Sequence, residues 1–320
     1  MIVDLHTRIW TSPAQLGESV AEQFRRRRTE PWEQTTGSAE QHAEAMDPVG
    51  VAAVLGFEST LLGAKIDHEQ VANEVTAHPS SRVGFAGIDP NAGHPVRSLE
   101  EALNAGLVGV TVCPAAAGFH PTDTRAMELF EACQSHRIPV HIESSGRLAR
   151  QARLEFDQPV LLDEVAREFP DLKLVLGSLG DPWVDQGVAL LAKHPTVYAD
   201  LAGLVSQPWR LLSSLLSAFH HQVIDQVLFA SNFPFCDPAQ AIKNMYSVNT
   251  VTQGTNLPSV PREQLRSIVE RDTLSVLGIP APPASAEDKN KPKAQTDEPA
   301  PTEEDTAEAP TYEVVEDPAR

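Results

Sequence analysis

The chain is poor in basic residues and has no long apolar runs. It contains 25 Lys and Arg against 44 Asp and Glu, a formal net charge of −19. A chain with this much negative charge is repelled by nucleic acid and by anionic membranes, and we expect neither as a partner. No apolar run reaches the roughly 18 residues of a membrane span, and the N-terminus lacks the basic flank and apolar stretch of a signal peptide. These absences predict a cytoplasmic protein.

Cysteine is also scarce. The three cysteines, Cys113, Cys133 and Cys236, are far apart in the chain, which argues against both a disulfide framework and a cysteine clamp for zinc. Cys113 is followed seven residues later by His120, so a nucleophilic Cys–His pair is one alternative. A buried, inert thiol is the more usual role of such a cysteine, and we favour it.

Large apolar side chains nearly disappear after residue 279. Residues 280–320 contain eight prolines and eleven acidic residues, so they cannot bury enough surface to offset their ordering entropy. We predict a globular domain at 1–279 and a disordered, solvating tail at 280–320, with an interaction arm as the alternative role. Four consecutive arginines, 25–28, follow a helix-like stretch at 18–24. They are typical of a solvated helix end, and holding an anionic ligand is the alternative.

Short apolar runs alternate with helical patterns along the globular part. The runs predict strands buried on both faces, at Ile2–His6, Val49–Leu55, Val83–Ile88, Gly106–Val112, Ile138–Glu143, Lys173–Gly177, Thr196–Asp200 and Val227–Ser231. Eight strands alternating with helices indicate an α/β fold, a single (β/α)8 TIM barrel. A doubly wound open sheet is the alternative, but no glycine-rich phosphate loop follows any of the strands.

The helical patterns between the strands end at prolines or glycines. We predict helices at Glu69–His78, Asp123–His136, Pro159–Phe169, Trp183–His194, Asp237–Tyr246 and Arg262–Leu277. The last of these is followed by Gly278, a suitable C-terminal cap.

In a TIM barrel the C-terminal ends of the strands face one shared pocket. The predicted ends place there His6, Arg8, Cys113, His141, Glu143, Ser178, Asp200, Ser231 and Asn232. His141 and Glu143 are two residues apart and share a strand face, and the same holds for His6 and Arg8 if their strand continues. Asp181 either points into the pocket or, as we favour, caps the helix that begins near Trp183. Each of these residues alone could be an ordinary residue of a barrel interior. Several charged and polar residues together at the barrel mouth, however, indicate a catalytic or binding site.

Six segments resemble, in order, the motifs of the amidohydrolase-related family, which includes metal-dependent decarboxylases and lactone hydrolases. They are 3–8 (VDLHTR), 78–90 (HPSSRVGFAGIDP), 138–146 (IPVHIESSG), 174–180 (LVLGSLG), 227–234 (VLFASNFP) and 271–278 (RDTLSVLG). The likeness runs from residue 1 to about 279, with a different insertion at 11–47. It implies the same TIM-barrel fold.

The resemblance also implies a metal site that this chain has largely lost. Family members hold zinc or a similar ion with histidines and an aspartate at the ends of barrel strands. Of the five matched positions His6 is retained, whereas the other four carry Arg8, Glu143, Ser178 and Asn232. His6 and Glu143 give fewer than the three protein ligands that a catalytic zinc normally has. We therefore expect no metal cofactor, with one weakly bound divalent ion such as zinc as the alternative.

The substitutions make electrostatic sense together. Arg8 is a permanent cation that repels a metal ion, and Glu143 is placed to pair with it. The neutral Asn232 removes a negative charge that a site without a metal does not need. The sequence thus predicts a buried Arg8–Glu143 ion pair in the former metal position.

These observations leave three possible functions. The one that we favour is a metal-independent or non-catalytic family member that binds a small ligand or a partner. The second is an active hydrolase or decarboxylase in which Glu143 is the general base and His6 its partner, although Arg8 would lower the pKa of that base. The third is a scaffold that acts through the acidic tail. By analogy with the family the ligand is a small carboxylated molecule, held by Arg8 or Arg147. A homodimer through the 11–47 insertion, near Trp10 and Trp32, is a further expectation.

Overall fold

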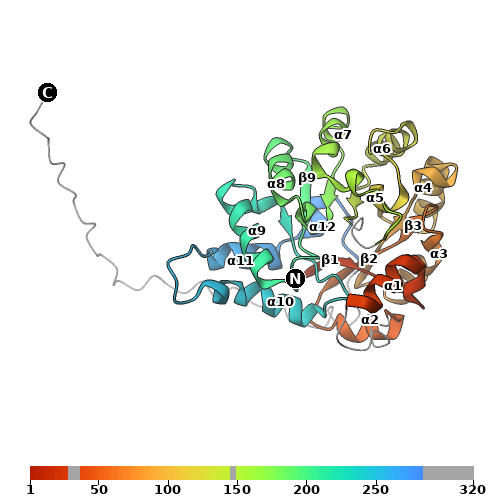
Figure 1. Ribbon diagram of the computed structural model, residues 1–320. Coiled ribbons are helices and arrows are strands. Elements are labelled where there is room, and N and C mark those ends of the chain that lie inside the picture. The colour runs from red at the N-terminus through yellow and green to blue at the C-terminus, as the bar shows by residue number, and fades with distance from the viewer. Residues whose placement is uncertain (28–36, 145–148, 284–320) are drawn as a thin grey trace, which may run out of the picture. The chain divides into compact units, whose positions relative to one another are not determined.

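Eight parallel strands stand at the centre of the molecule, each hydrogen-bonded to the next along the chain (Figure 1). The computed structural model describes residues 1–27, 37–144 and 149–283. The strands are β1 (Val3–Thr7), β2 (Val51–Leu55), β5 (Arg82–Gly87), β6 (Gly109–Val112), β7 (Val140–Ile142), β8 (Leu174–Leu176), β9 (Val197–Asp200) and β10 (Val227–Leu228). Beyond β10, Asn232 N donates to His6 O at 3.1 Å and brings this segment back to β1. The predicted TIM barrel is confirmed.

Helices surround the strands in Figure 1. Their bounds are α1 (Glu18–Arg27), α2 (Ala39–Ala45), α3 (His68–Ala77), α4 (Pro95–Asn104), α5 (Pro114–Ala117), α6 (Thr124–His136), α7 (Asp163–Glu168), α8 (Val184–Lys193), α9 (Pro208–His220), α10 (Pro238–Ser247), α11 (Arg262–Glu270) and α12 (Thr273–Leu277). The prediction of a single helix at 262–277 is wrong, because the segment forms two helices, α11 and α12. The segment is divided because Asp272 leaves the helical conformation and caps α12, accepting from Ser275 N at 3.2 Å. Gly278 ends α12 in the left-handed conformation, as predicted.

Four helices, α2, α4, α5 and α9, and one hairpin were not expected from the sequence. The helices α4 and α9 each begin with a proline, which lacks the N–H that a first helical residue leaves unused anyway. The hairpin pairs β3 (Phe57–Ser59) with β4 (Ala64–Ile66) outside the barrel sheet. Its strands have three residues each, which is too short for an alternating pattern to be recognised.

The barrel interior is apolar at one end and polar at the other. Side chains of β1, β2, β5, β8 and β10 pack together with Leu274 and Leu277 of α12, which fills the N-terminal end of the barrel. Gly109 on β6 is required there, because a Cβ atom would lie 2.3 Å from the ring of Phe85. The apolar layer supports the polar side chains above it, toward the C-terminal ends of the strands.

A register shift in β1 directs the first site residues. Asp4 pairs with Ala52 of β2 but Thr7 pairs with Val54, so β1 contains one residue more than its partner over this stretch. Such bulges commonly re-aim side chains next to a functional site. Here the strand continues far enough for both His6 and Arg8 to reach Glu143 across the barrel.

The insertion after β1 contains α1 and α2, and part of it packs on the barrel. Trp10, just before it, is 2% exposed and its ring lies 5.4 Å from that of Phe235. Trp10 is therefore a core residue and not available for the dimer contact considered above. Residues 25–27 end α1. Arg28, Trp32, Arg147 and residues 284–320 of the tail predicted at 280–320 lie outside the described residues.

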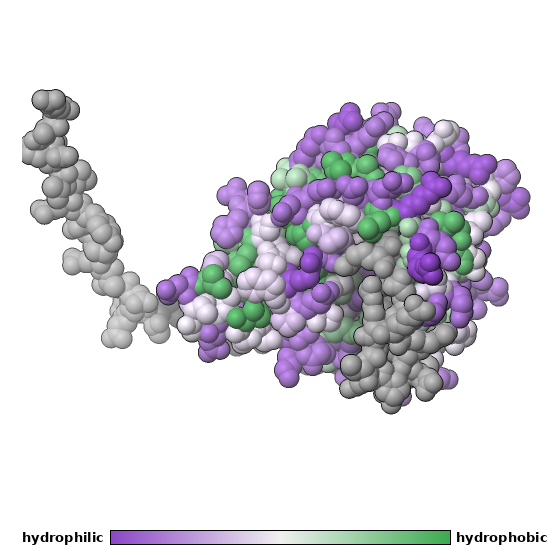
Figure 2. All heavy atoms as spheres, in the orientation of Figure 1, coloured by the Kyte–Doolittle hydropathy of each residue, from purple (hydrophilic) through white to green (hydrophobic). Residues whose placement is uncertain are grey.

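The face of the molecule shown in Figure 2 is largely polar outside the grey residues. Figure 2 shows hydrophilic residues over most of one face, with apolar residues scattered among them. Among the described residues, no helix has both the length and the apolar character needed to cross a membrane.

Candidate functional site

Five charged or ionisable side chains meet inside the C-terminal half of the barrel. They come from strands that are far apart in the sequence and are all at most 7% exposed: His6, Arg8, His141, Glu143 and Asp200. The alternation of side chains along a strand explains two of these pairings. His141 lies on β7 with Glu143 two residues later, and His6 and Arg8 have the same spacing at the end of β1.

The Arg8–Glu143 ion pair predicted from the sequence is present. The two guanidinium nitrogens Nη1 and Nη2 donate to the two oxygens of Glu143, the first at 3.3 Å, in a two-pronged contact. Burial alone would raise the pKa of Glu143, but the charge of Arg8, followed by that of His6, lowers the pKa to about 2. Glu143 is thus a carboxylate at any physiological pH, and a weak base.

Asp200 joins the two histidines. Its Oδ2 lies 2.9 Å from His6 Nδ1 and 2.7 Å from His141 Nε2. The other oxygen, Oδ1, accepts from the backbone N–H groups of Ser178 at 2.6 Å and Ala202 at 3.0 Å. Burial raises the pKa of Asp200, but the interactions with the two histidines outweigh burial and hold it far below its usual value. Asp200 was placed at a strand end by the sequence, yet nothing in the motifs indicated this connecting role.

Ser178 takes part through its backbone. Ser178 and Leu179 both adopt the left-handed conformation, with φ of 55° and 52°, which is uncommon outside glycine. This turn directs Ser178 N at Asp200, while Ser178 Oγ accepts from Gly203 N at 2.8 Å. Ser178, which the resemblance aligned with a metal-ligand position, therefore holds Asp200 in place.

Asn232 also acts through its backbone. It adopts a φ of 68°, donates its N–H to His6 O, and accepts from Phe235 N at 2.8 Å. These contacts form the turn that returns the chain to β1. Nearby, burial raises the pKa of Asp4 to about 6, although Asp4 accepts from Ser231 N at 2.9 Å.

Cys113 and Asp181 lie outside the group around Asp200. Burial, and next the charge of Glu143, raise the pKa of the Cys113 thiol well above its usual value, as expected of an inert cysteine. His120 instead contacts Thr122 Oγ1 through Nδ1 at 2.8 Å. Asp181 is fully buried and forms an ion pair with Arg210 of α9. It does not cap α8, whose N-cap residue is Trp183.

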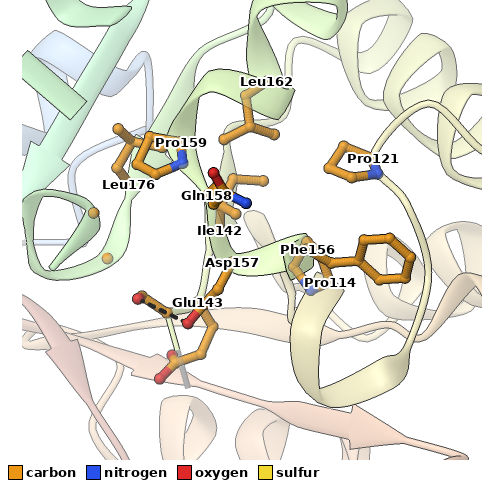
Figure 3. A pocket seen from close by; sticks show the side chains of 13 residues that line it. Pro114, Pro121, Ile142, Glu143, Phe156, Asp157, Gln158, Pro159, Leu162 and Leu176 are labelled. Atoms are coloured by element: carbon orange, nitrogen blue, oxygen red, sulfur yellow. Dashed lines mark hydrogen bonds between the residues drawn. The ribbon is translucent and has the colours of Figure 1, made fainter. Parts of the chain in front are cut away.

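A pocket opens beside Glu143 (Figure 3). Its cavity volume is about 20 Å³, room for about one water molecule and well below the roughly 300 Å³ of the smallest small-molecule sites. Figure 3 shows the carboxyl groups of Glu143 and Asp157 together on one side and apolar side chains such as Phe156 and Leu162 opposite. Of the predicted site residues, Glu143 lines this pocket, whereas His6 and His141 are buried beside it. Asp157 was missed, because it lies in a short 3-10 turn, Leu154–Asp157, and not at a strand end.

A metal ion needs several donor atoms that lie close together. Ligand atoms of His6, His141 and Glu143 lie within 4.8 Å of one another. Asp200 engages one nitrogen of each histidine, as carboxylates do in metal sites, and among the described residues His6 Nε2 and His141 Nδ1 have no hydrogen-bond partner. The obstacle to an ion is Arg8, which donates to both oxygens of Glu143. A divalent cation would have to displace or approach a buried guanidinium, which repels it. With Arg8 in place, these residues do not fit the family's metal ion.

Comparison with known proteins agrees with the fold. A family model described as amidohydrolase matches residues 3–263. Two similar solved structures are an uncharacterised TIM-barrel protein from Bordetella bronchiseptica (20% identity, 87% of this chain and 99% of that chain, TM-score 0.64) and 5-carboxyvanillate decarboxylase from Sphingomonas paucimobilis (13%, 87% and 99%, TM-score 0.62). A 2,6-dihydroxybenzoate decarboxylase from Rhizobium is also similar (14%, 87% and 98%, TM-score 0.59). No curated protein matches the chain.

Proposed function

Since this chain belongs to the amidohydrolase family, we propose that it is a metal-independent member that binds a small ligand at the C-terminal mouth of the barrel, beside Glu143. One observation carries the proposal: the guanidinium of Arg8 is paired with both oxygens of Glu143 at two of the family's metal-ligand positions. A fixed organic cation there takes the place of the ion and of its charge. The shared barrel supports ligand binding at the C-terminal mouth.

Metal content tests this proposal directly. Protein purified without chelator and without added metal should carry far less than one equivalent of zinc, manganese or iron, because Arg8 opposes a cation. Elemental mass spectrometry gives the ratio. The triple variant Arg8→His/Glu143→His/Asn232→Asp, which restores three family ligand types, should bind about one equivalent. Arg97→His, on the exposed part of α4, is the matched control and should bind none. About one equivalent in the unaltered protein would sink the proposal.

Ligand chemistry is tested separately. A small carboxylated ligand is the expectation from the family, so benzoate should raise the melting temperature by a few degrees at concentrations well above its dissociation constant. The variant Gln158→Trp, which places a large ring at the barrel mouth beside Glu143, should abolish this rise. If benzylamine raises the melting temperature and benzoate does not, the ligand is an amine and the expectation of a carboxylate fails.

An active hydrolase or decarboxylase is the second candidate. It is favoured by the position of His6 Nε2, 3.5 Å from Glu143 Oε2, with Glu143 lining the pocket. Against it, a general base should have a pKa near the working pH, and the pKa of Glu143 is about 2. Turnover of benzoate-type acids that disappears in Glu143→Gln would favour this candidate. A scaffold role through the tail concerns residues outside those described, and deletion of 284–320 followed by a partner-capture assay tests it.

A further inference from the structure

A second buried polar cluster joins the insertion to the barrel, away from the pocket. His42 of α2 is fully buried, and its ring lies 5.3 Å from that of Phe233. Its Nε2 lies 2.9 Å from Thr7 Oγ1, and Thr7 Oγ1 donates to Ala53 O at 2.7 Å. The single hydroxyl proton of Thr7 is donated to Ala53 O, so Thr7 Oγ1 must accept in its contact with His42. Nε2 of His42 therefore carries a proton and donates it to Thr7 Oγ1. The neutral imidazole thus presents the unprotonated Nδ1 on its other side.

That other side faces one carboxylate shared by several groups. Glu74 Oε1 of α3 lies 3.5 Å from His42 Nδ1, 3.2 Å from His78 Nδ1 and 3.8 Å from Arg82 Nε. Glu74 and Arg82 are both 4% exposed, and their opposite charges balance. None of these four atoms has a hydrogen-bond partner among the described residues. One carboxylate therefore faces three groups able to carry positive charge.

We propose that this cluster is an acid-sensitive latch that holds α2 against α3 and β1 at neutral pH and releases it on mild acidification. A proton added to His42 gives the cluster a positive charge in excess of the single negative charge of Glu74. The charged groups facing His42 are Glu74 and His78 from α3 and Arg82 from β5, and Asp4 of β1 interacts with Arg82. Glu40 and Glu44, on α2 itself, are exposed.

The direction of the pH effect follows from burial. Burial lowers the pKa of His42 and outweighs the opposing influence of Glu74, with Arg82 adding to the lowering. A buried histidine of lowered pKa contributes stability above its ordinary pKa of about 6.5, and this contribution falls as the pH drops below that value. The pKa of Glu74 is lowered by its three neighbours in spite of burial, so its contribution is lost only in stronger acid. Release of α2 would free Thr7, which lies between the site residues His6 and Arg8.

Hydrogen exchange with mass spectrometry tests the latch. After correction for intrinsic rates, the opening constant of α2 should be up to about tenfold larger at pH 5.5 than at pH 7.5, the effect of one proton one unit below its free pKa. The helix α8, in the same molecule, is the internal reference and should change far less. An α2 whose opening constant is equal at both pH values overturns the proposal.

Two histidine variants separate titration from packing. His42→Gln keeps an amide donor for Thr7 but cannot titrate, so its α2 should open to the same extent at both pH values. His136→Gln, at the exposed end of α6, should retain the full response of the unaltered protein. If His42→Gln keeps the same pH response, His42 is not the sensor and the proposal fails. Should His42→Gln not fold, the comparison of α2 with α8 in the unaltered protein still decides.

Discussion

Replacing Arg8 by methionine should lower the free energy of unfolding by about 3–5 kcal/mol at pH 7. The change leaves the carboxylate of Glu143, which is 7% exposed, buried without the partner that donates to both its oxygens. Glu143→Met should have a comparable cost, because it leaves the guanidinium of Arg8 unpaired. Urea unfolding followed by circular dichroism gives both values.

The double variant and an exposed ion pair provide the controls. Arg8→Met/Glu143→Met removes both charges together and should recover most of the lost stability, since an apolar pair of similar volume can replace a buried ion pair. Arg97→Ala breaks an ion pair with Glu101 at 2.9 Å whose side chains are 75% and 58% exposed, and should cost less than about 1 kcal/mol. Single variants as stable as the unaltered protein would contradict a buried ion pair at this position.

The Arg8–Glu143 pair was predictable from the identity of the two residues and from their spacing within two strands. The two-residue spacing on each strand fixes which side chains share a face, and the order of the strands brings the end of β1 opposite the end of β7. The resemblance then aligned both residues with metal-ligand positions. Charge complementarity completed the prediction, and no three-dimensional detail beyond the barrel itself was required.

The role of Asp200 was not predictable in the same way. Its contact with both His6 and His141 depends on the relative heights of β1, β7 and β9 in the barrel. Those heights are set in part by the register shift between Asp4 and Thr7, and a one-residue change in register alters which face a side chain occupies. Likewise, the left-handed turn at Ser178 uses a backbone N–H, which carries no signal in residue identity.

Asp200 should therefore be a structural centre of the site, and Asp200→Asn should cost at least about 3 kcal/mol at pH 7. The fully buried carboxylate accepts from two backbone N–H groups and contacts both imidazoles. An asparagine keeps one oxygen and presents an NH2 group where the second acceptor was. Either both imidazoles or both backbone N–H groups then lose the oxygen that they contact, at a fully buried position.

The pH dependence distinguishes this role from simple packing. The pKa of Asp200 is lowered on folding, so its stabilising contribution is complete above the ordinary aspartate pKa of about 3.9 and is lost as the pH falls below that value. The difference in unfolding free energy between the unaltered protein and Asp200→Asn should thus shrink by up to about 1.4 kcal/mol per pH unit below pH 4. Asp185→Asn, at an exposed position of α8, should follow the unaltered protein throughout. If the Asp200→Asn curve also runs parallel to that of the unaltered protein, the carboxylate charge does not hold the two histidines, and packing alone accounts for the cost.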